Sequence, residues 1–348
     1  MGYMKKYTCP TCTITSSVVR QRKRADSIVF FCKACRKYFS INTRWIARKQ
    51  ILSDHLDGLS FRKLGDRYGI SPMKAWRICH AELKALPDNN QFTHRYCNRY
   101  SSVLMVDGKY FNVADKPHAY VLLWGIDYFK HDIPVITVAP SENYQSWARY
   151  FSYFRILSCY PQLVVCDDNY NLKTAARERF PAVRIQTCYN HFKENIRRDL
   201  KVGSEGKEKY RDFMRRIESI LDSSQKLSDE TFNRWMFTLL RDYRQDPLCL
   251  SILINIDHYK GELLAYRGIP SAPLTTNLIE GMNKHIESRL TALNAFQSVA
   301  HAKLWFNGYI LKRRYTKFTD TRGKFKHLRG TRGVDQTKKE RVTLPLYF

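Results

Sequence analysis

Two aspartates in this sequence stand where a protein could use them to hold metal ions. Asp107 follows the apolar run 101–106 and precedes Gly108, and Asp167 follows the apolar run 163–166. Acids at the carboxyl ends of strands lie at the edge of a sheet where ligands bind. Two such strands can be neighbours although their acids are far apart in sequence. We therefore expect the two carboxylates to share one cation.

A third acid is expected on a helix that crosses this sheet. Thr and Asn residues at 275–277 can cap a helix, and Glu280 falls in or near its first turn. At about 100° per residue, Glu280, Asn283 and Glu287 share the flank of the helix's apolar stripe. Glu280 is the favoured third carboxylate, and Glu287 is its alternative.

Three carboxylates suit hard divalent ions such as Mg²⁺ or Mn²⁺, which take oxygen ligands and leave positions for phosphate and water. Two such ions about 4 Å apart could activate the attacking oxygen and stabilise the leaving oxygen of a phosphodiester displacement. A single carboxylate at a strand end or helix start is more often simply solvated. The prediction therefore depends on the joint placement of the three acids.

Four cysteines near the start have the spacing of a zinc ribbon, which we place at residues 1–42. Cys9 and Cys12 form one CxxC pair, and Cys32 and Cys35 form a second. Two such pairs complete a closed tetrahedral Zn²⁺ site, which leaves no position for a substrate. We therefore expect one structural zinc ion, the alternative being two redox dithiols.

Residues 43–90 have the pattern of a helix-turn-helix. Ser60 and Ser71 can cap two successive helices, Gly69 permits the turn between them, and Pro72 suits a first helical turn. The second helix would face the major groove of DNA, with Trp76 and Ile78 in the core. The cations expected to contact DNA from this helix and from the zinc ribbon are Arg22, Lys23, Arg24, Lys74 and Arg77.

The rest of the chain predicts an α/β fold. Apolar runs predict three meandering strands, and alternating helices and strands follow them. This order is typical of a ribonuclease-H-like sheet. The expected strands are 103–106, 119–128, 133–139, 163–166 and 183–187, and the expected helices between them are 144–157 and 172–179.

We divide this remainder into four parts. The first part of the catalytic domain is expected at 98–195, an all-helical insertion at 196–270 and the last part of the catalytic domain at 271–315. A basic tail at 316–348 is expected to be partly disordered.

The charge is concentrated at the two ends of the chain. The formal charge is +27, of which residues 1–100 carry +14 and residues 301–348 carry +10. A polyanion bound by both ends fits this distribution, because each phosphate that is neutralised releases a counterion. A solvated surface or a membrane-surface patch is the alternative, but neither end has a basic amphipathic helix. No apolar run of membrane-spanning length and no secretory signal is present, so we expect a cytoplasmic, nucleoid-associated protein.

Several motifs taken together resemble Mutator-like transposases and their bacterial insertion-sequence relatives. The motifs are Val106-Asp-Gly108, Val164-Val-Cys-Asp-Asp-Asn169, Phe180-Pro181, Gln186-Thr-Cys-Tyr-Asn-His191 and Thr276-Asn-Leu-Ile-Glu-Gly-Met-Asn283. The resemblance spans residues 100–315 in order. It implies that Asp107, Asp167 and Glu280 are a DDE triad on a ribonuclease-H-like fold with a helical insertion before the glutamate.

The chain departs from the family pattern at one point. The family often has a small residue after the second aspartate, whereas Asp168 follows here. The choice between Asp167 and Asp168 is therefore open, and Asp167 is favoured because it directly continues the strand. Cys188 and His191 match the family's Cys-x-x-His element, so we expect them to lie beside the metal site or to contact DNA, or else to be a packed pair.

We therefore expect a DNA transposase of an insertion sequence. Its N-terminal modules would bind the terminal repeats of the element, and two Mg²⁺ ions would serve cleavage and strand transfer. Joining two DNA ends requires two active sites, so a homodimer or larger assembly on double-stranded DNA is expected. The rival hypotheses are a DNA-binding regulator without catalysis and a structure-directed nuclease of the same fold.

Overall fold

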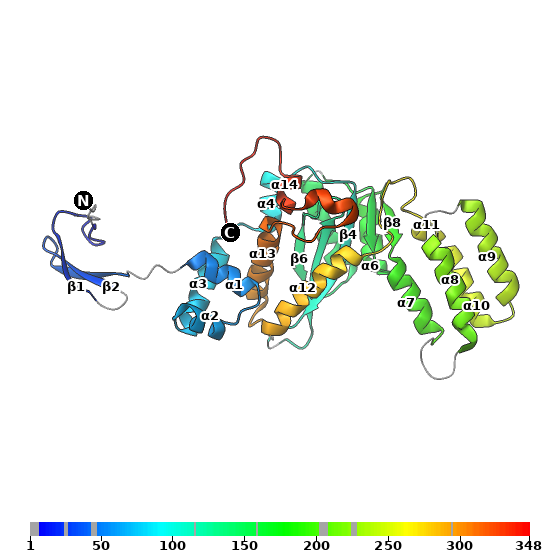
Figure 1. Cartoon of the computed structure of the whole chain (residues 1–348), viewed down its shortest axis with the longest axis horizontal. Coiled ribbons are helices and arrows are strands. Elements are labelled where there is room, and N and C mark those ends of the chain that lie inside the picture. The colour runs from blue at the N-terminus through cyan, green and yellow to red at the C-terminus, as the bar shows by residue number, and fades with distance from the viewer. Residues whose placement is uncertain are drawn as a thin grey trace.

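The computed structural model describes residues 7–23, 27–42, 47–114, 116–157, 159–201, 208–223, 228–293 and 295–348. The first elements are β1 (Val18–Lys23), β2 (Ser27–Cys32) and β3 (Lys37–Asn42). They form an antiparallel sheet in the order β1-β2-β3 (Figure 1). One turn, before β1, carries Cys9 and Cys12, whereas Cys32 ends β2 and Cys35 lies in the turn between β2 and β3.

Three helices follow: α1 (Arg48–Leu56), α2 (Phe61–Tyr68) and α3 (Pro72–Ala85). The predicted caps are confirmed, because Ser60 accepts a hydrogen bond from the Lys63 amide and Ser71 accepts one from the Lys74 amide. Gly69 ends α2 with a φ of 59°, which favours glycine. The turn between the two helices thus has the chemistry that the sequence indicates.

Trp76 is not in the core, contrary to prediction. It is 38% exposed on α3 and stacks on His80 with ring centroids 5.1 Å apart. Ile78 is buried, as predicted. The indole finds its partner one helical turn away, on the outer surface of the same helix.

The central sheet has the order β6-β5-β4-β7-β8. Its strands are β4 (Val103–Phe111), β5 (Tyr120–Asp127), β6 (Ile136–Ala139), β7 (Leu163–Cys166) and β8 (Arg184–Thr187). The first three are an antiparallel meander, and β7 and β8 continue the sheet parallel to β4. Both the predicted meander and the two later strands are confirmed.

Helices cover both faces of this sheet. On one face, Leu104 and Val106 pack with the aromatic helix α5 (Tyr144–Ile156) and with α6 (Tyr170–Arg179). On the other face, Val103 and Met105 join the core that includes α12 (Asn277–Leu293) and α13 (Val299–Tyr315). The alternation along β4 is the two-residue period of a strand that is buried on both faces.

The region between β8 and α12 is helical in the residues that the structure describes, as predicted. Its elements are α7 (Tyr189–Asp199), η1 (Glu208–Tyr210), α8 (Arg211–Ser223), α9 (Asp229–Tyr243), α10 (Pro247–His258) and α11 (Lys260–Leu263). They gather at one end of the molecule, in green to yellow in Figure 1. In the described part of the chain, no helix has the length and apolar character needed to cross a membrane.

α13 joins the N-terminal helices to the sheet. A Cβ atom on Gly308 of α13 would collide with Leu83 of α3, so the two helices approach closely. Leu56, Leu83 and Phe306 belong to one continuous hydrophobic core with the sheet. The N-terminal helices and the sheet therefore share one core.

The C-terminal segment 316–348, which is expected to be partly disordered before docking, is folded in the structure. Residues 316–348 fold back over the sheet domain through η3 (Gly323–Leu328) and α14 (Gly333–Thr337), with α4 (Asn89–Tyr96) beneath them. Arg314 is fully buried and donates to Asp132 at 2.8 and 2.7 Å, and Thr337 also donates to this carboxylate. A buried ion pair that is completed by the tail keeps the basic segment folded.

Candidate active site

The two strand-end aspartates lie on neighbouring parallel strands. β4 pairs with β7 so that Met105 lies opposite Val165, and this register places Asp107 and Asp167 at corresponding positions. β4 runs on to Phe111, so Asp107 marks the end of its pairing with β7 and not the end of the strand. The structure thus places the two aspartates as predicted relative to each other.

The surroundings of Asp107 are electrostatically unfavourable for an ionised carboxylate. Burial, together with the nearby carboxylates of Asp167 and Glu142, raises the pKa of Asp107 to about 7, although the Gly108 amide donates to this carboxylate at 2.8 Å and opposes the shift. Burial also raises the pKa of Asp167. Like charges held together in a partly buried site are relieved when a cation binds between them.

Helix α12 reaches this edge of the sheet through Asn283. The Asn283 side-chain amide donates to Asp107 at 2.6 Å and accepts from the Trp124 indole at 3.2 Å. Since Trp124 is on β5, the asparagine connects α12 to two strands. The flank of α12 that carries Asn283 therefore faces the carboxylates.

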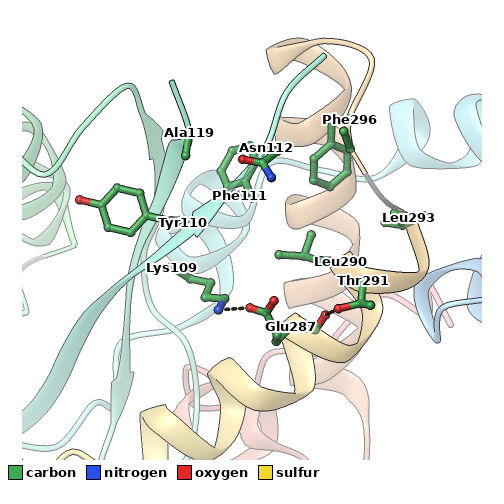
Figure 2. A pocket seen from close by; sticks show the side chains of 11 residues that line it. Lys109, Tyr110, Phe111, Asn112, Ala119, Glu287, Leu290, Thr291, Leu293 and Phe296 are labelled. Atoms are coloured by element: carbon green, nitrogen blue, oxygen red, sulfur yellow. Dashed lines mark hydrogen bonds and ion pairs between the residues drawn. The ribbon is translucent and has the colours of Figure 1, made fainter. Parts of the chain in front are cut away.

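The two candidate glutamates on α12 have different surroundings. Glu280 accepts from the Thr276 hydroxyl at 2.5 Å and lies 3.9 Å from His191 Nε2. Glu287 is ion-paired with Lys109, and its side chain is 56% exposed. Figure 2 shows this ion pair beside a separate cleft of about 530 Å³ between β4 and α12. The geometry thus associates Glu280, and not Glu287, with the residues around the aspartates.

Cys188 and His191 lie next to Glu280. The Cys188 sulfur, a His191 ring nitrogen and a Glu280 oxygen all lie within 4.8 Å of one another. The hydrogen bond with Cys188, together with the Glu280 and Asp167 carboxylates, raises the pKa of His191 to about 9, although burial opposes the shift. Burial would raise the pKa of Cys188, but hydrogen bonds from His191 and Thr276 lower it. A charged imidazolium beside these carboxylates offsets part of their repulsion.

Asp168 is engaged in a different ion network. It pairs with Lys173, which is 3% exposed and lies 2.6 Å from Glu262 of α11. Glu262 also accepts from the Thr187 hydroxyl at 2.7 Å and pairs with Arg177. Because Lys173 already balances Asp168, the geometry favours Asp167 as the carboxylate available to a metal ion.

Glu142, which was not predicted from the sequence, also lies at this site. Its carboxylate accepts from the Asn169 side chain at 2.7 Å, and burial together with Asp167 raises its pKa. A Cβ atom on Gly108 would collide with this carboxylate, so the space that Gly108 leaves is occupied by Glu142. The glycine after Asp107 was the available signal, but it could not identify which side chain would use the space.

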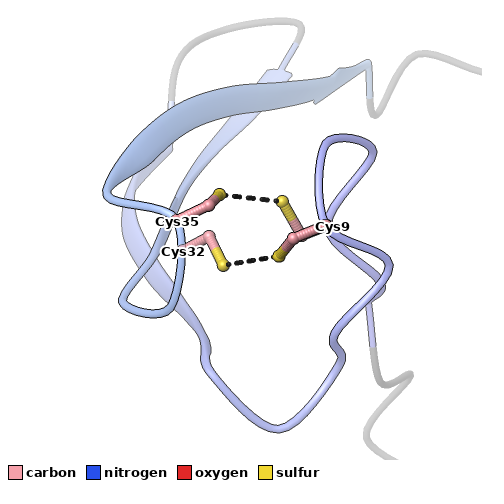
Figure 3. A group of neighbouring side chains, drawn as sticks. Cys9, Cys32 and Cys35 are labelled. Carbon is pink, nitrogen blue, oxygen red and sulfur yellow. Dashed lines mark hydrogen bonds between the residues drawn. The ribbon is translucent and has the colours of Figure 1, made fainter.

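The four N-terminal cysteines lie close together, and Figure 3 labels three of them, Cys9, Cys32 and Cys35. Cys9 Sγ is 3.6 Å from Cys35 Sγ, and Cys12 Sγ is 3.5 Å from Cys32 Sγ. Tetrahedral zinc with Zn–S bonds of about 2.3 Å requires sulfurs about 3.8 Å apart. The cluster therefore fits a zinc ion held by four thiolates.

The cations predicted to contact DNA are exposed where the structure describes them. Lys74 and Arg77 lie on the outer surface of α3, and Arg22 and Lys23 lie on β1. Arg24 lies outside the described residues. Exposure keeps these side chains available to an external polyanion.

Comparison with known proteins places the chain in a family. The family model described as "Transposase, Mutator family" matches residues 3–304. The chain therefore belongs to the Mutator family of transposases, which confirms the resemblance drawn from its motifs. The search of curated proteins gave no match.

Solved structures give more distant likenesses. The catalytic core of HTLV-2 integrase in complex with magnesium is 14% identical, with a TM-score of 0.22, and the match covers 41% of this chain and 86% of that one. The simian T-cell lymphotropic virus intasome in complex with PP2A regulatory subunit B56 gamma is 13% identical, with a TM-score of 0.23 and coverage of 60% and 64%. Scores this low carry no argument about this chain.

Proposed function

We propose that this chain is a catalytically competent DNA transposase in which Asp107, Asp167 and Glu280 hold the catalytic metal ions. The observation that carries the proposal is the hydrogen bond from Asn283 to Asp107. It links the flank of α12 that bears Glu280 to the sheet edge that bears both aspartates. In the proposal, two strands and one helix supply the three carboxylates of one metal site.

The architecture supports a ribonuclease-H-like catalytic domain. Its sheet has an antiparallel meander followed by two parallel strands, and the acids come from the adjacent strands β4 and β7. The parts of this domain would be residues 98–195 and 271–315, separated by the helical insertion at 196–270. This division places the third acid after the insertion.

The donor set suits Mg²⁺ or Mn²⁺, and two ions per site are proposed. When bound, the ions activate the attacking oxygen and stabilise the leaving oxygen of a phosphodiester. Asn283 orients Asp107, and Thr276 orients Glu280. His191 lies close enough to the carboxylates to contact a phosphate beside them.

DNA would be bound outside this site by the N-terminal modules. The proposed zinc ribbon and helix-turn-helix present Arg22, Lys23, Lys74 and Arg77 on their surfaces. Double-stranded element ends and target DNA are the proposed partners, with at least two copies of the chain on the DNA. A nucleoid location follows from such binding.

A cleavage assay with labelled element ends and Mg²⁺ or Mn²⁺ tests the proposal. We expect Asp107→Asn and Glu280→Gln to reduce cleavage and strand transfer by more than about 10³-fold. Glu287→Gln is the matched control on the same helix and should retain activity within a few-fold. Full activity of Asp107→Asn would show that these carboxylates are not catalytic. Hydrolysis without joining would instead favour a nuclease.

A further inference from the structure

A groove on α12 carries an excess of positive charge. It has a volume of about 640 Å³ and lies between α12, α13 and the C-terminal segment 316–325. Its lining includes Met282 and Arg289, whereas Glu280 and Asn283 point to a different flank of the same helix. The charged residues that line it are Arg289, Lys312, Arg313, Lys317 and Arg322, with Asp57 and Asp320.

The acids do not balance these cations. Lys312 forms an ion pair with Asp57 at 2.6 Å, and Arg289 lies 3.9 Å from the same carboxylate. Within the described ranges, Arg313, Lys317 and Arg322 have no acidic partner within 4.0 Å. The Arg289 Nε is also buried without a hydrogen-bond partner there. The groove therefore has positive charge that no acid balances and a hydrogen-bond donor that has no acceptor.

Two adjacent arginines on α13 show the contrast. Arg314 is fully buried, and two hydrogen bonds to Asp132 balance its charge. Arg313 is partly buried, donates to the Met282 sulfur at 3.4 Å and lies over the Phe318 ring at 5.2 Å. Burial lowers the pKa of Arg313, and the nearby Arg289 lowers it further. Holding such a cation without an anion costs free energy in the isolated chain.

The position of the groove indicates which anion completes it. Asp57 is the C-cap residue of α1, so the groove borders the predicted helix-turn-helix. α13, which supplies Arg313, packs closely against α3. We infer from this proximity that the backbone of a duplex held by α3 passes the groove. Phosphates are bound by guanidinium groups through directed, charge-assisted hydrogen bonds.

We propose that Arg289 and Arg313 bind backbone phosphates of the DNA whose bases face α3. This inference rests on the proposed function in one respect, namely that DNA is the substrate. It assigns to the side of α12 away from the carboxylates a separate role in holding the duplex.

The salt dependence of DNA binding tests the proposal. The affinity for a labelled 30-bp duplex of mixed sequence would be measured at several salt concentrations. Each lost phosphate contact should lower the slope of log K against log salt by about 0.9. We expect Arg313→Met and Arg289→Met each to show this loss and the double variant to lose about 1.8. Arg216→Met, whose charge Asp242 already balances, is the control and should keep the wild-type slope.

Thermal unfolding distinguishes this role from a structural one. Methionine preserves much of the packing of the arginine stem, so Arg313→Met should leave the melting temperature unchanged or raise it. Arg314→Met should lower it strongly, because Asp132 would lose its buried partner. An unchanged salt slope for the Arg289→Met, Arg313→Met double variant would overturn the proposal. A fall in melting temperature for Arg313→Met as large as that for Arg314→Met would also overturn it.

The active-site proposal can fail independently. Asp107→Asn should keep the full salt slope, because Asp107 is not in the groove. If the chain cleaves DNA with metal but the groove variants keep the wild-type salt slope, the proposed function stands and the proposed role of the groove is refuted. If the groove variants have reduced salt slopes but no metal-dependent cleavage occurs, the role of the groove stands and the proposed active site is refuted.

Discussion

Thr276 shows how a single proton can determine the arrangement around a proposed metal ligand. Its hydroxyl oxygen is 2.5 Å from Glu280 Oε1 and 3.1 Å from the Cys188 sulfur. A hydroxyl has one proton to donate, and an ionised carboxylate can only accept. When the hydroxyl donates to ionised Glu280, a hydrogen bond between this hydroxyl and Cys188 must use the thiol proton, whereas the Thr276 backbone amide donates to the Cys188 sulfur at 3.3 Å in either case. Cys188 and Thr276 together hold Glu280 in one orientation.

We predict that Thr276→Val weakens this orientation. The expected result is a 10- to 100-fold lower cleavage rate, the range typical of residues that orient a metal ligand, and a higher Mg²⁺ concentration for half-maximal rate. Thr276→Ser restores the hydroxyl and should bring both quantities close to wild type. Rates measured across a Mg²⁺ series check this, and a wild-type Mg²⁺ dependence for Thr276→Val would contradict it.

A second prediction at this scale concerns Gly108. A Cβ atom there would collide with the Glu142 carboxylate and come within 3.1 Å of Val121. Gly108→Ala should therefore displace Glu142 and destabilise the fold by about 1–3 kcal/mol. The cost should be smaller when Glu142 is already alanine. A double-mutant cycle of urea unfolding measures this coupling, and additive free energies would refute it.

At the scale of elements, the sequence was most informative where structure depends on local chemistry. β7 coincides with the predicted run 163–166 because a short apolar segment is buried on both faces. The caps of α2 and α3 were predictable because they involve residues three positions apart. Trp76 was misplaced because helical periodicity does not reveal which face packs. Glu142 was missed because its contacts with Gly108 and Asn169 depend on tertiary structure.

His55 on α1 leads to a prediction about pH. It is buried, and burial lowers its pKa to about 4, although a hydrogen bond with the Leu59 carbonyl opposes the shift. Below about pH 6.5, His55 binds a proton in the unfolded chain but stays neutral in the folded chain. The free energy of unfolding therefore falls as the pH drops from about 6.5 to about 4. The loss attributable to His55 is about 3 kcal/mol at most. Urea unfolding at pH 7 and pH 5 measures it.

The matched variant is His55→Gln, which cannot titrate in this range. It should show a weaker dependence of stability on pH, whatever its stability at pH 7. His131, whose pKa burial also lowers to about 4, would contribute to the slope in the same direction. An identical slope in His55→Gln and the wild type would rule out this contribution.

At the scale of the whole molecule, a buried ion network attaches the helical insertion to the sheet domain. Lys173 of α6 pairs with Asp168, which follows β7, and with Glu262 of α11. Its ammonium also lies 4.8 Å from the centre of the Tyr259 ring. The sequence could not reveal this network, because Lys173 and Glu262 are 89 residues apart and meet only in the fold.

We predict that Lys173→Met loosens this attachment. Two carboxylates would lose their buried partner, so the expected destabilisation is about 3–5 kcal/mol. Arg177→Met is the control, because Arg177 pairs with the same Glu262 but its side chain is half exposed, and its loss should cost about 1 kcal/mol or less. Thermal unfolding and limited proteolysis would measure both, and equal effects would contradict the prediction.

The close packing of Gly308 on Leu83 has a consequence for the DNA itself. Because α3 and the sheet share one core, the protein would set a fixed spacing between the bases that α3 is proposed to read and the phosphodiester that the carboxylates are proposed to cut. Inserting about five base pairs between the two would rotate the cleavage point by half a helical turn, away from the active site. About ten inserted base pairs would turn the cleavage point back toward the active site but would leave it too far along the duplex. We therefore expect the chain to cleave neither of the two DNAs with insertions efficiently.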